Sequence, residues 1–268
     1  MILVTGATGM LASAIVDQLQ QMNSPVVGAS RTPANDQRHM DFDEPATLSL
    51  TGVSTLVLVS AGYAEDDVVI ARHKALISAA VRDRVSHIVY TSVTGAGDHL
   101  GFALAHRVTE RMLRESGIQW TILRNGIYAE LFGALLAWTA GGLESPFGDG
   151  AISSVARADL AEVAARVASS PDNHRQRIYE LVGKPLTAAT VASHVGVTHQ
   201  SIGLGEYRDR VLNDRRLLPF QPPMLASIAS SIRHGLLHNS STDLERLLGR
   251  PATNSLAIAA RTANTSRS

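Results

Sequence analysis

A short glycine-containing turn near the start of the chain has the residue types that bind a pyrophosphate. The apolar run 2–4 ends in Thr5 and Gly6, and a helical pattern begins near Gly9. A helix that starts in this way exposes unpaired N–H groups and the positive end of its dipole, which suit a phosphate. Gly6 allows the tight turn, and Gly9 lets the backbone approach the phosphates. The turn therefore predicts dinucleotide binding, and the alternative is an ordinary strand-to-helix turn.

The residues after the second predicted strand bear on which dinucleotide is bound. An Asp or Glu about 20 residues after the glycines would bind the ribose hydroxyl of NAD. Here the strand 26–30 is followed by Arg31 and Thr32, with no carboxylate. A guanidinium can bind a 2′-phosphate through paired, charge-assisted hydrogen bonds. Arg31 therefore predicts a preference for NADPH, and the alternative is a solvated loop arginine.

Small and polar residues follow two further predicted strands, at 54–60 and 86–92. The first of these is an almost continuous apolar run, typical of a parallel strand that is buried on both faces. Open α/β sheets bind their ligands at the carboxyl ends of the strands. We therefore expect the cofactor to lie beside the residues at these two strand ends, which are Ser60, Ala61, Gly62, Thr91 and Ser92.

The Tyr/Lys pair of the usual short-chain dehydrogenase reaction is missing. In that reaction a Tyr exchanges a proton with the substrate oxygen, and a Lys four residues later lowers the pKa of the Tyr. The residues four positions after the five tyrosines are Asp67, Thr94, Phe132, Gly183 and Val211. None of them is Lys, so ordinary alcohol oxidation by this mechanism is not expected. The chain also has no Gly-x-Ser-x-Gly turn and no His-Glu-x-x-His motif.

Strand and helix patterns alternate over residues 1–124. The apolar spacing predicts helices at 9–22, 65–84 and 99–116, with short or buried strands between them. This alternation predicts an α/β fold, a Rossmann-type doubly wound parallel sheet with right-handed crossovers. His73 and Lys74 fall on the second helix and are expected at its surface.

The pattern changes after Asn125, which indicates a second region. The segments expected there are an apolar helix at 127–140, a helix at 157–169, a strand at 177–182, a short helix at 187–196 and mostly helical structure over 204–248. We expect residues 1–125 to form the dinucleotide-binding core. Residues 126–250 are expected to form a smaller, mostly helical region that caps the substrate, with one strand rejoining the core sheet. Residues 251–268 are rich in Ala, Ser, Thr and Asn and are expected to be a flexible tail.

Composition limits the classes of function. The 268 residues are 45% hydrophobic, and their formal net charge of zero does not favour binding to nucleic acid or to a membrane surface. The absence of cysteine excludes disulfides, thiol catalysis and thiolate metal sites, and no metal is expected. The N-terminal apolar run is too short for a signal peptide, and no apolar stretch reaches the roughly 18–20 residues of a membrane span. We therefore expect a soluble, cytoplasmic protein that acts on a small molecule.

Several stretches occur in an order that is typical of one family. They are Val4–Leu11, Ser30–Ala34, His87–Ser92, Thr121–Tyr128, Gly148–Ser153 with Arg157–Asp159, Ile178–Leu181 and Asp243–Pro251. With these stretches, which cover most of its length, the chain resembles the NmrA-like, atypical short-chain dehydrogenase/reductases. Within that group it is most similar to the type 2 NADPH-dependent quinone oxidoreductases and the triphenylmethane reductases.

The resemblance implies a Rossmann fold, NADPH as cofactor and an electron-poor, quinone-like acceptor. It identifies the 2′-phosphate ligand as Arg31 and is consistent with a homodimer. It places the pyrophosphate loop on Gly6, Ala7, Thr8, Gly9, Met10 and Leu11.

A quinone needs little acid–base help, because it is already a strong hydride acceptor. The protein then supplies proximity and hydrogen-bond donors for the developing oxyanion, and water can supply the proton. The candidate donors are Asn125 and Tyr128, with His106 as a third that could act as a general acid. Each has a structural alternative: Asn125 can tie two loops together, Tyr128 can pack at a helix start, and a lone helix histidine such as His106 can be structural.

Two functions follow from this sequence. The first is an NADPH-dependent reductase of quinones or similar acceptors. The second is an NmrA-like redox sensor that binds a dinucleotide and regulates a partner without turnover. The resemblance extends into the C-terminal half, where a substrate would bind, and this favours the reductase.

Overall fold

The structure of the chain is a computed structural model that describes residues 1–34, 36–61 and 64–266. The chain divides into two compact units, which are called here the first unit and the second unit. The first unit comprises Met1–Val93, Leu104–Asn125 and Ala158–Glu180. The second unit comprises Thr94–Ala103, Gly126–Arg157 and Leu181–Ser268.

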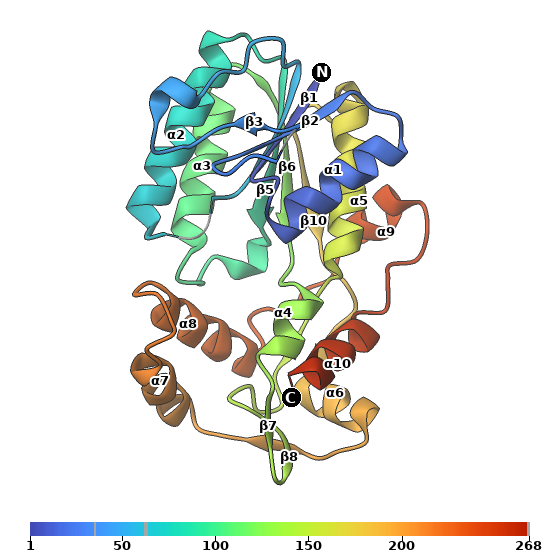
Figure 1. Cartoon of the computed structure of the whole chain (residues 1–268). Helices are drawn as coiled ribbons and strands as arrows, with labels where there is room; N and C mark the ends of the chain where they lie inside the picture. The colour runs from blue at the N-terminus through green and yellow to red at the C-terminus, as the bar shows by residue number, and fades with distance from the viewer. Residues whose placement is uncertain (35, 62–63, 267–268) are drawn as a thin grey trace. The chain divides into compact units, whose positions relative to one another are not determined.

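The first unit is built on a seven-stranded sheet (Figure 1). Its strands are β1 (Ile2–Thr5), β2 (Val26–Ser30), β3 (Arg38–His39), β4 (Thr55–Val59), β5 (His87–Val93), β6 (Gln119–Asn125) and β10 (Arg177–Leu181). The strand order is β10-β6-β5-β4-β1-β2-β3, and the pairs from β3 across to β6 are parallel. Successive strands are added on one side of β1 as far as β3 and then, from β4 onward, on its other side, as in the Rossmann fold. The predicted fold class is therefore confirmed.

The central strands are continuous apolar runs because helices cover both faces of the sheet. All seven residues of β5 and all four residues of β1 are buried. The helices α1 (Met10–Gln21) and α5 (Arg157–Ser169) lie on one face, and α2 (Asp66–Arg82) and α3 (Ala103–Glu115) lie on the other (Figure 1). Short 3₁₀ helices are η1 (Pro45–Thr47), η2 (Gly95–Gly97) and η3 (Pro171–His174). Both α5 and β10 belong to the first unit, so residues 158–180 return to the core after the chain has entered the second unit.

One expectation about the first unit is wrong. His73 was expected at the surface of α2 and is fully buried. The reason is that both ring nitrogens of His73 are bonded within the protein, one to the Thr109 hydroxyl and the other to the Ala61 amide. A polar ring can be buried when its hydrogen bonds are satisfied in this way.

The second unit contains short helices and two small sheets. Its helices are α4 (Ala129–Ala134), α6 (Ala188–Val195), α7 (Leu204–Asn213), α8 (Gln221–Arg233), α9 (Asp243–Leu248) and α10 (Ser255–Thr265). Its strands are β7 (Ala137–Thr139), β8 (Gly142–Ser145), β9 (Ala151–Ile152), β11 (Leu186–Thr187) and β12 (His199–Ser201). One sheet has the order β12-β8-β7, and in the other β11 pairs antiparallel with β9. The single helix expected over 127–140 is wrong, because α4 ends at Ala134 and the chain then forms β7.

The flexible tail expected at the C-terminus is wrong for residues 255–265, which form α10. Asn254 caps this helix by accepting the N–H groups of Leu256 and Ala257. The indole Nε1 of Trp138 donates to the Ala263 carbonyl at 2.7 Å. A Cβ on Gly133 of α4 would overlap the backbone of α10, so the two helices pack backbone to backbone. The small alanines of the segment permit this close contact, which a composition rich in Ala, Ser and Thr does not reveal.

A helix that crosses a membrane must be both long and apolar. None of the described helices meets both requirements for crossing a bilayer.

Candidate functional site

The turn after β1 presents backbone groups at the start of α1. Gly6 has a φ of +66°, in the left-handed region that favours glycine. The Gly9 N–H donates to the Gly6 carbonyl at 2.8 Å, and a Cβ on Gly9 would lie 3.2 Å from that same oxygen. Gly9 is the N-cap residue of α1, and no side chain caps this helix. The first N–H groups of α1 therefore keep the capacity to bind an anion.

The remaining residues of the predicted pyrophosphate loop divide into a buried and an exposed set. Ala7 is buried, and its N–H donates to a carbonyl of β2 at 3.0 Å. A Cβ on Gly28 would lie 2.6 Å from the Ala7 Cβ, so β2 requires glycine at this point. Leu11 is buried, whereas Thr8 is exposed and Met10 is 73% exposed. The loop is thus backed by the core and open on its outer side, as a ligand-binding loop must be.

Arg31 directly follows β2 and is exposed. Within the described part of the chain, no hydrogen bond or ion pair engages its guanidinium. Its charge contributes to the lowered pKa of Asp43, after the larger effect of the hydrogen bond from Arg72. A guanidinium that no described residue engages, at this strand end, fits the binding of a 2′-phosphate.

Side chains from three elements fix the backbone at the end of β4. Three successive N–H groups there donate to side chains. The bonds are Val59 N–H to Thr5 Oγ1 at 3.0 Å, Ser60 N–H to Thr91 Oγ1 at 3.2 Å and Ala61 N–H to His73 Nε2 at 3.1 Å. These acceptors come from β1, β5 and α2. Ser60 and Ala61 therefore turn their N–H groups into the protein and would offer a cofactor only their small side chains and carbonyl groups. Gly62, which was expected beside them, lies outside the described residues.

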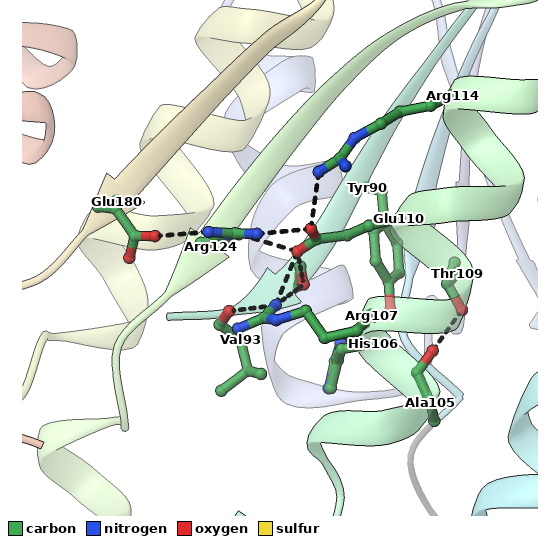
Figure 2. A network of polar contacts seen from close by, with 11 residues as sticks. Tyr90, Val93, Ala105, His106, Arg107, Thr109, Glu110, Arg114, Arg124 and Glu180 are labelled. Atoms are coloured by element: carbon green, nitrogen blue, oxygen red, sulfur yellow. Dashed lines mark hydrogen bonds and ion pairs between the residues drawn. The ribbon is translucent and has the colours of Figure 1, made fainter. Parts of the chain in front are cut away.

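A buried carboxylate on α3 organises the ends of β5 and β6 (Figure 2). Glu110 is 2% exposed and binds Arg107 at 2.7 Å, Arg124 at 2.7 Å and Arg114 at 3.2 Å. The Ser92 hydroxyl also donates to it at 2.7 Å. Burial would raise the pKa of Glu110, but the hydrogen bonds from Arg124 and Ser92 and the nearby guanidinium charges outweigh it, and the pKa is lowered. Ser92 was expected to lie beside the cofactor, and in this structure its hydroxyl proton is directed at Glu110.

The same network reaches two further positions (Figure 2). Arg107 donates to the Val93 carbonyl at 3.1 Å, and Arg124 binds Glu180 of β10 at 3.2 Å. Three adjacent strands are therefore connected through α3 at their carboxyl ends. We did not predict this cluster from the sequence, although Arg107, Glu110 and Arg114 have the i, i+3 and i+4 spacing that pairs charges on a helix.

His106 lies in the first turn of α3, beside Tyr90 of β5. The Tyr90 hydroxyl is 2.8 Å from His106 Nδ1, and Tyr90 is fully buried. Burial and the charge of Arg107 lower the pKa of His106 to about 4, although Glu110 acts in the opposite direction. His106 is therefore uncharged near neutral pH. The ring of His106 can therefore act as a neutral hydrogen-bonding group, but not as an imidazolium acid.

Asn125 ends β6 and is 6% exposed. Its side-chain Oδ1 is buried and has no hydrogen-bond partner among the described residues. An unmet buried acceptor costs stability unless a ligand or water binds it, so such groups are uncommon in folded proteins. Asn125 therefore has an unmet hydrogen-bond acceptor at the carboxyl edge of the sheet, the edge that binds ligands in this fold.

Tyr128 belongs to the second unit, whereas His106 and Asn125 belong to the first. It is the N-cap residue of α4 and is partly buried. The Arg157 guanidinium lies 5.0 Å from the centre of its ring, within the range of a cation–π contact. The Glu130 carboxylate accepts the Arg157 N–H at 3.2 Å. These contacts give the Tyr128 ring a defined position at the start of the helix.

A cavity of about 570 Å³ lies at the opposite edge of the same sheet. Its lining includes Ser54, His87, Asp172 and Arg175, which are at or near the amino ends of strands. Because parallel α/β sheets bind ligands at their carboxyl ends, this cavity is not the candidate dinucleotide site.

Comparisons with known proteins indicate the same dinucleotide-binding fold. Residues 6–171 match a family described as NAD(P)H-binding. Quinone oxidoreductase 2 of Escherichia coli (strain K12) is 36% identical over 276 residues, which cover 94% of this chain and 95% of that protein. The crystal structure of an Escherichia coli NADPH-dependent quinone oxidoreductase complexed with NADPH has a TM-score of 0.86 and 32% identity, and the match covers 97% of this chain and 99% of that one. The Citrobacter sp. triphenylmethane reductase complexed with NADP(H) has a TM-score of 0.86 and 28% identity, over 98% of this chain and 100% of that one.

Proposed function

The chain belongs to the NAD(P)H-binding family, among the NmrA-like atypical short-chain dehydrogenase/reductases, and we propose that it reduces a quinone or a similar electron-poor acceptor with NADPH. The observation that carries this proposal is the similarity to quinone oxidoreductase 2, because it extends over 94% of the chain and thus over both units. The start of α1 and the guanidinium of Arg31 have no side-chain partner among the described residues, and both fit the cofactor independently of that similarity.

In this proposal the first unit binds NADPH through the loop Gly6–Leu11 and through Arg31. The N–H groups at the start of α1 bind the pyrophosphate, and the guanidinium binds the 2′-phosphate. Ser60, Ala61, Thr91 and Ser92 border the cofactor at the ends of β4 and β5. When it is bound, NADPH supplies the hydride.

The chain's own polar groups then stabilise charge on the acceptor. A quinone that gains a hydride becomes a hydroquinone anion, and one proton from water completes the hydroquinone. Asn125, Tyr128 and His106 are proposed to donate hydrogen bonds to the oxygen on which the charge develops. No Tyr/Lys pair is needed for this, because the reaction is driven by aromatisation of the acceptor.

The test is NADPH oxidation in the presence and absence of p-benzoquinone. We expect oxidation that depends on the quinone, saturates with both substrates and is faster with NADPH than with NADH. The loss of NADPH absorbance measures it, and protein-free quinone is the blank. Calorimetry in the same buffer measures NADPH binding without turnover. Tight binding with no quinone-dependent oxidation would contradict the reductase and favour the alternative, an NmrA-like sensor.

A further inference from the structure

A buried chain of hydrogen bonds connects the end of β4 to the first turn of α3. The Ala61 N–H donates to His73 Nε2 at 3.1 Å, so this nitrogen is an acceptor and the ring proton is on Nδ1. His73 Nδ1 then donates to Thr109 Oγ1 at 2.8 Å, and the Thr109 hydroxyl donates to the Ala105 carbonyl at 2.7 Å. The direction of each bond follows from the backbone groups at the two ends, which cannot exchange their roles as donor and acceptor.

Tyr90 lies between two histidine rings, His73 on α2 and His106 on α3. The ring centroids are 5.7 Å apart for His73 and Tyr90 and 5.9 Å apart for Tyr90 and His106. Tyr90 and His106 are both drawn in Figure 2, behind the charged network of Glu110. The Tyr90 hydroxyl makes a hydrogen bond of 2.8 Å with His106 Nδ1.

The chemistry of the two groups gives this bond a direction. A neutral imidazole nitrogen is a good acceptor, whereas a phenol oxygen is a weak acceptor and its O–H a good donor. Burial raises the pKa of Tyr90, so the hydroxyl keeps its proton at neutral pH. The groups that act on His106 include Arg107 and Glu110 on its own helix, His73 on α2 and Tyr90 on β5, and burial lowers the pKa of His106 to about 4. A neutral His106 that accepts this bond at Nδ1 carries its ring proton on Nε2.

We propose that Tyr90 is a positioning residue that holds His106 in the Nε2–H tautomer, so that the ring is a neutral hydrogen-bond donor toward the oxygen of the hydride acceptor. His106 is at the correct edge for this role, because α3 follows β5 and its first turn lies at the carboxyl ends of the strands. The part that concerns the acceptor rests on the proposed function, whereas the part that concerns the tautomer rests on the bond between Tyr90 and His106 and on the chemistry of these two groups.

The chain offers a matched control for the substitution Tyr90→Phe. The Tyr179 hydroxyl lies 2.9 Å from His174 Nδ1, with ring centroids 5.7 Å apart, so Tyr179→Phe removes the same kind of bond elsewhere in the first unit. We expect Tyr90→Phe to lower kcat for quinone reduction roughly tenfold, a loss typical of partners that orient a functional histidine. The KM values for NADPH and quinone should change little, and Tyr179→Phe should keep the kcat of the original protein.

A second readout does not need activity. Long-range ¹H–¹⁵N NMR of histidine-labelled protein without cofactor reports which ring nitrogen carries the proton, and His106→Gln identifies the signal. We expect the Nε2–H tautomer of His106 in the unsubstituted protein and in Tyr179→Phe, and a mixture of tautomers in Tyr90→Phe.

The outcomes separate the two proposals. If His106 in the unsubstituted protein is protonated on Nδ1, the inference is overturned, even if Tyr90→Phe does not fold. A folded Tyr90→Phe with unchanged kcat and unchanged tautomer also overturns it. If the unsubstituted protein does not reduce quinone, the proposed function fails, and the NMR spectrum still decides whether Tyr90 sets the tautomer of His106.

Discussion

Arg31 is the side chain that bears most directly on the choice between NADPH and NADH. It is exposed at the end of β2, and no described residue forms an ion pair with it. We expect Arg31→Ala to weaken NADPH binding by about 1.5–3 kcal/mol, or roughly 10- to 150-fold, because a hydrogen bond to a charged group is lost. Binding of NADH, which has no 2′-phosphate, should change by less than about twofold. Calorimetric titration with each dinucleotide measures both values.

The control for this prediction is Arg38→Ala. Arg38 lies on the neighbouring strand β3 and donates to the Thr51 carbonyl at 3.3 Å, so it already has a partner in the protein. Its removal should leave the NADPH-to-NADH ratio unchanged. If Arg31→Ala weakens both dinucleotides equally, Arg31 is not the phosphate ligand.

Among the elements, α3 supplies the carboxylate around which the ends of β5 and β6 are arranged. Its Glu110 binds arginines from α3 itself and from β6, and one of these, Arg107, also binds the last carbonyl of β5. We expect Glu110→Gln to lower the free energy of unfolding by about 2–3 kcal/mol. The charges of Arg107 and Arg124 then lose their buried partner, but both side chains are about one-fifth exposed, which reduces the cost. Urea denaturation measures the change.

Glu206→Gln is the matched control on α7. Glu206 pairs with Arg210 at 2.5 Å, and the two side chains are 53% and 50% exposed. Exposed i, i+4 pairs contribute about 0.3–0.5 kcal/mol, so this variant should be almost as stable as the unsubstituted protein. Equal losses in the two variants would show that the Glu110 cluster does not connect the strands as inferred.

The response of the whole molecule to acid follows from its buried histidines. Burial is the main cause that lowers the pKa of His73 to about 3 and those of His87 and His106 to about 4, from an ordinary value of 6.5. Between pH 6.5 and 4 the unfolded chain therefore binds more protons than the folded one, and the free energy of unfolding falls as the pH falls. Each histidine should contribute about 1–2 kcal/mol of loss between pH 6.5 and 5. Glu110, whose pKa is lowered in the folded state, adds a further loss at lower pH.

Urea denaturation at pH 7.5 and pH 5 tests this prediction. His87→Gln should reduce the loss, because the amide can still donate to Thr121, the partner of His87 Nε2 at 2.8 Å, but does not titrate. The exposed His238 provides the control, and His238→Gln should leave the loss unchanged. The same free energy of unfolding at both pH values would contradict the prediction.

Much of the fold could be predicted because its signals are local. The glycines of the first turn, the apolar runs of the strands and the periodicity of α1 and α2 are each contained within a few turns of chain. The errors occurred where local signals conflict with packing. Residues 255–265 have the composition of a loose tail, but small side chains let them pack as α10 against α4. Residues 137–139 continue an apolar run, but they form β7 because β8 is available to pair with them.

By itself, the sequence determined the dinucleotide-binding turn, the position of Arg31, the alternating α/β architecture and the absence of a Tyr/Lys pair. All of these depend on residue types at fixed spacings along the chain. Only the tertiary structure decided which polar side chains meet. His73 and Thr109 are 36 positions apart, Ser92 and Glu110 are 18 apart, and Tyr90 and His106 are 16 apart. Such contacts depend on the register between strands and on the face that each helix turns toward the sheet. The sequence therefore named His106 as a candidate, and the fold showed that a buried tyrosine bonds it and that burial lowers the pKa of its ring.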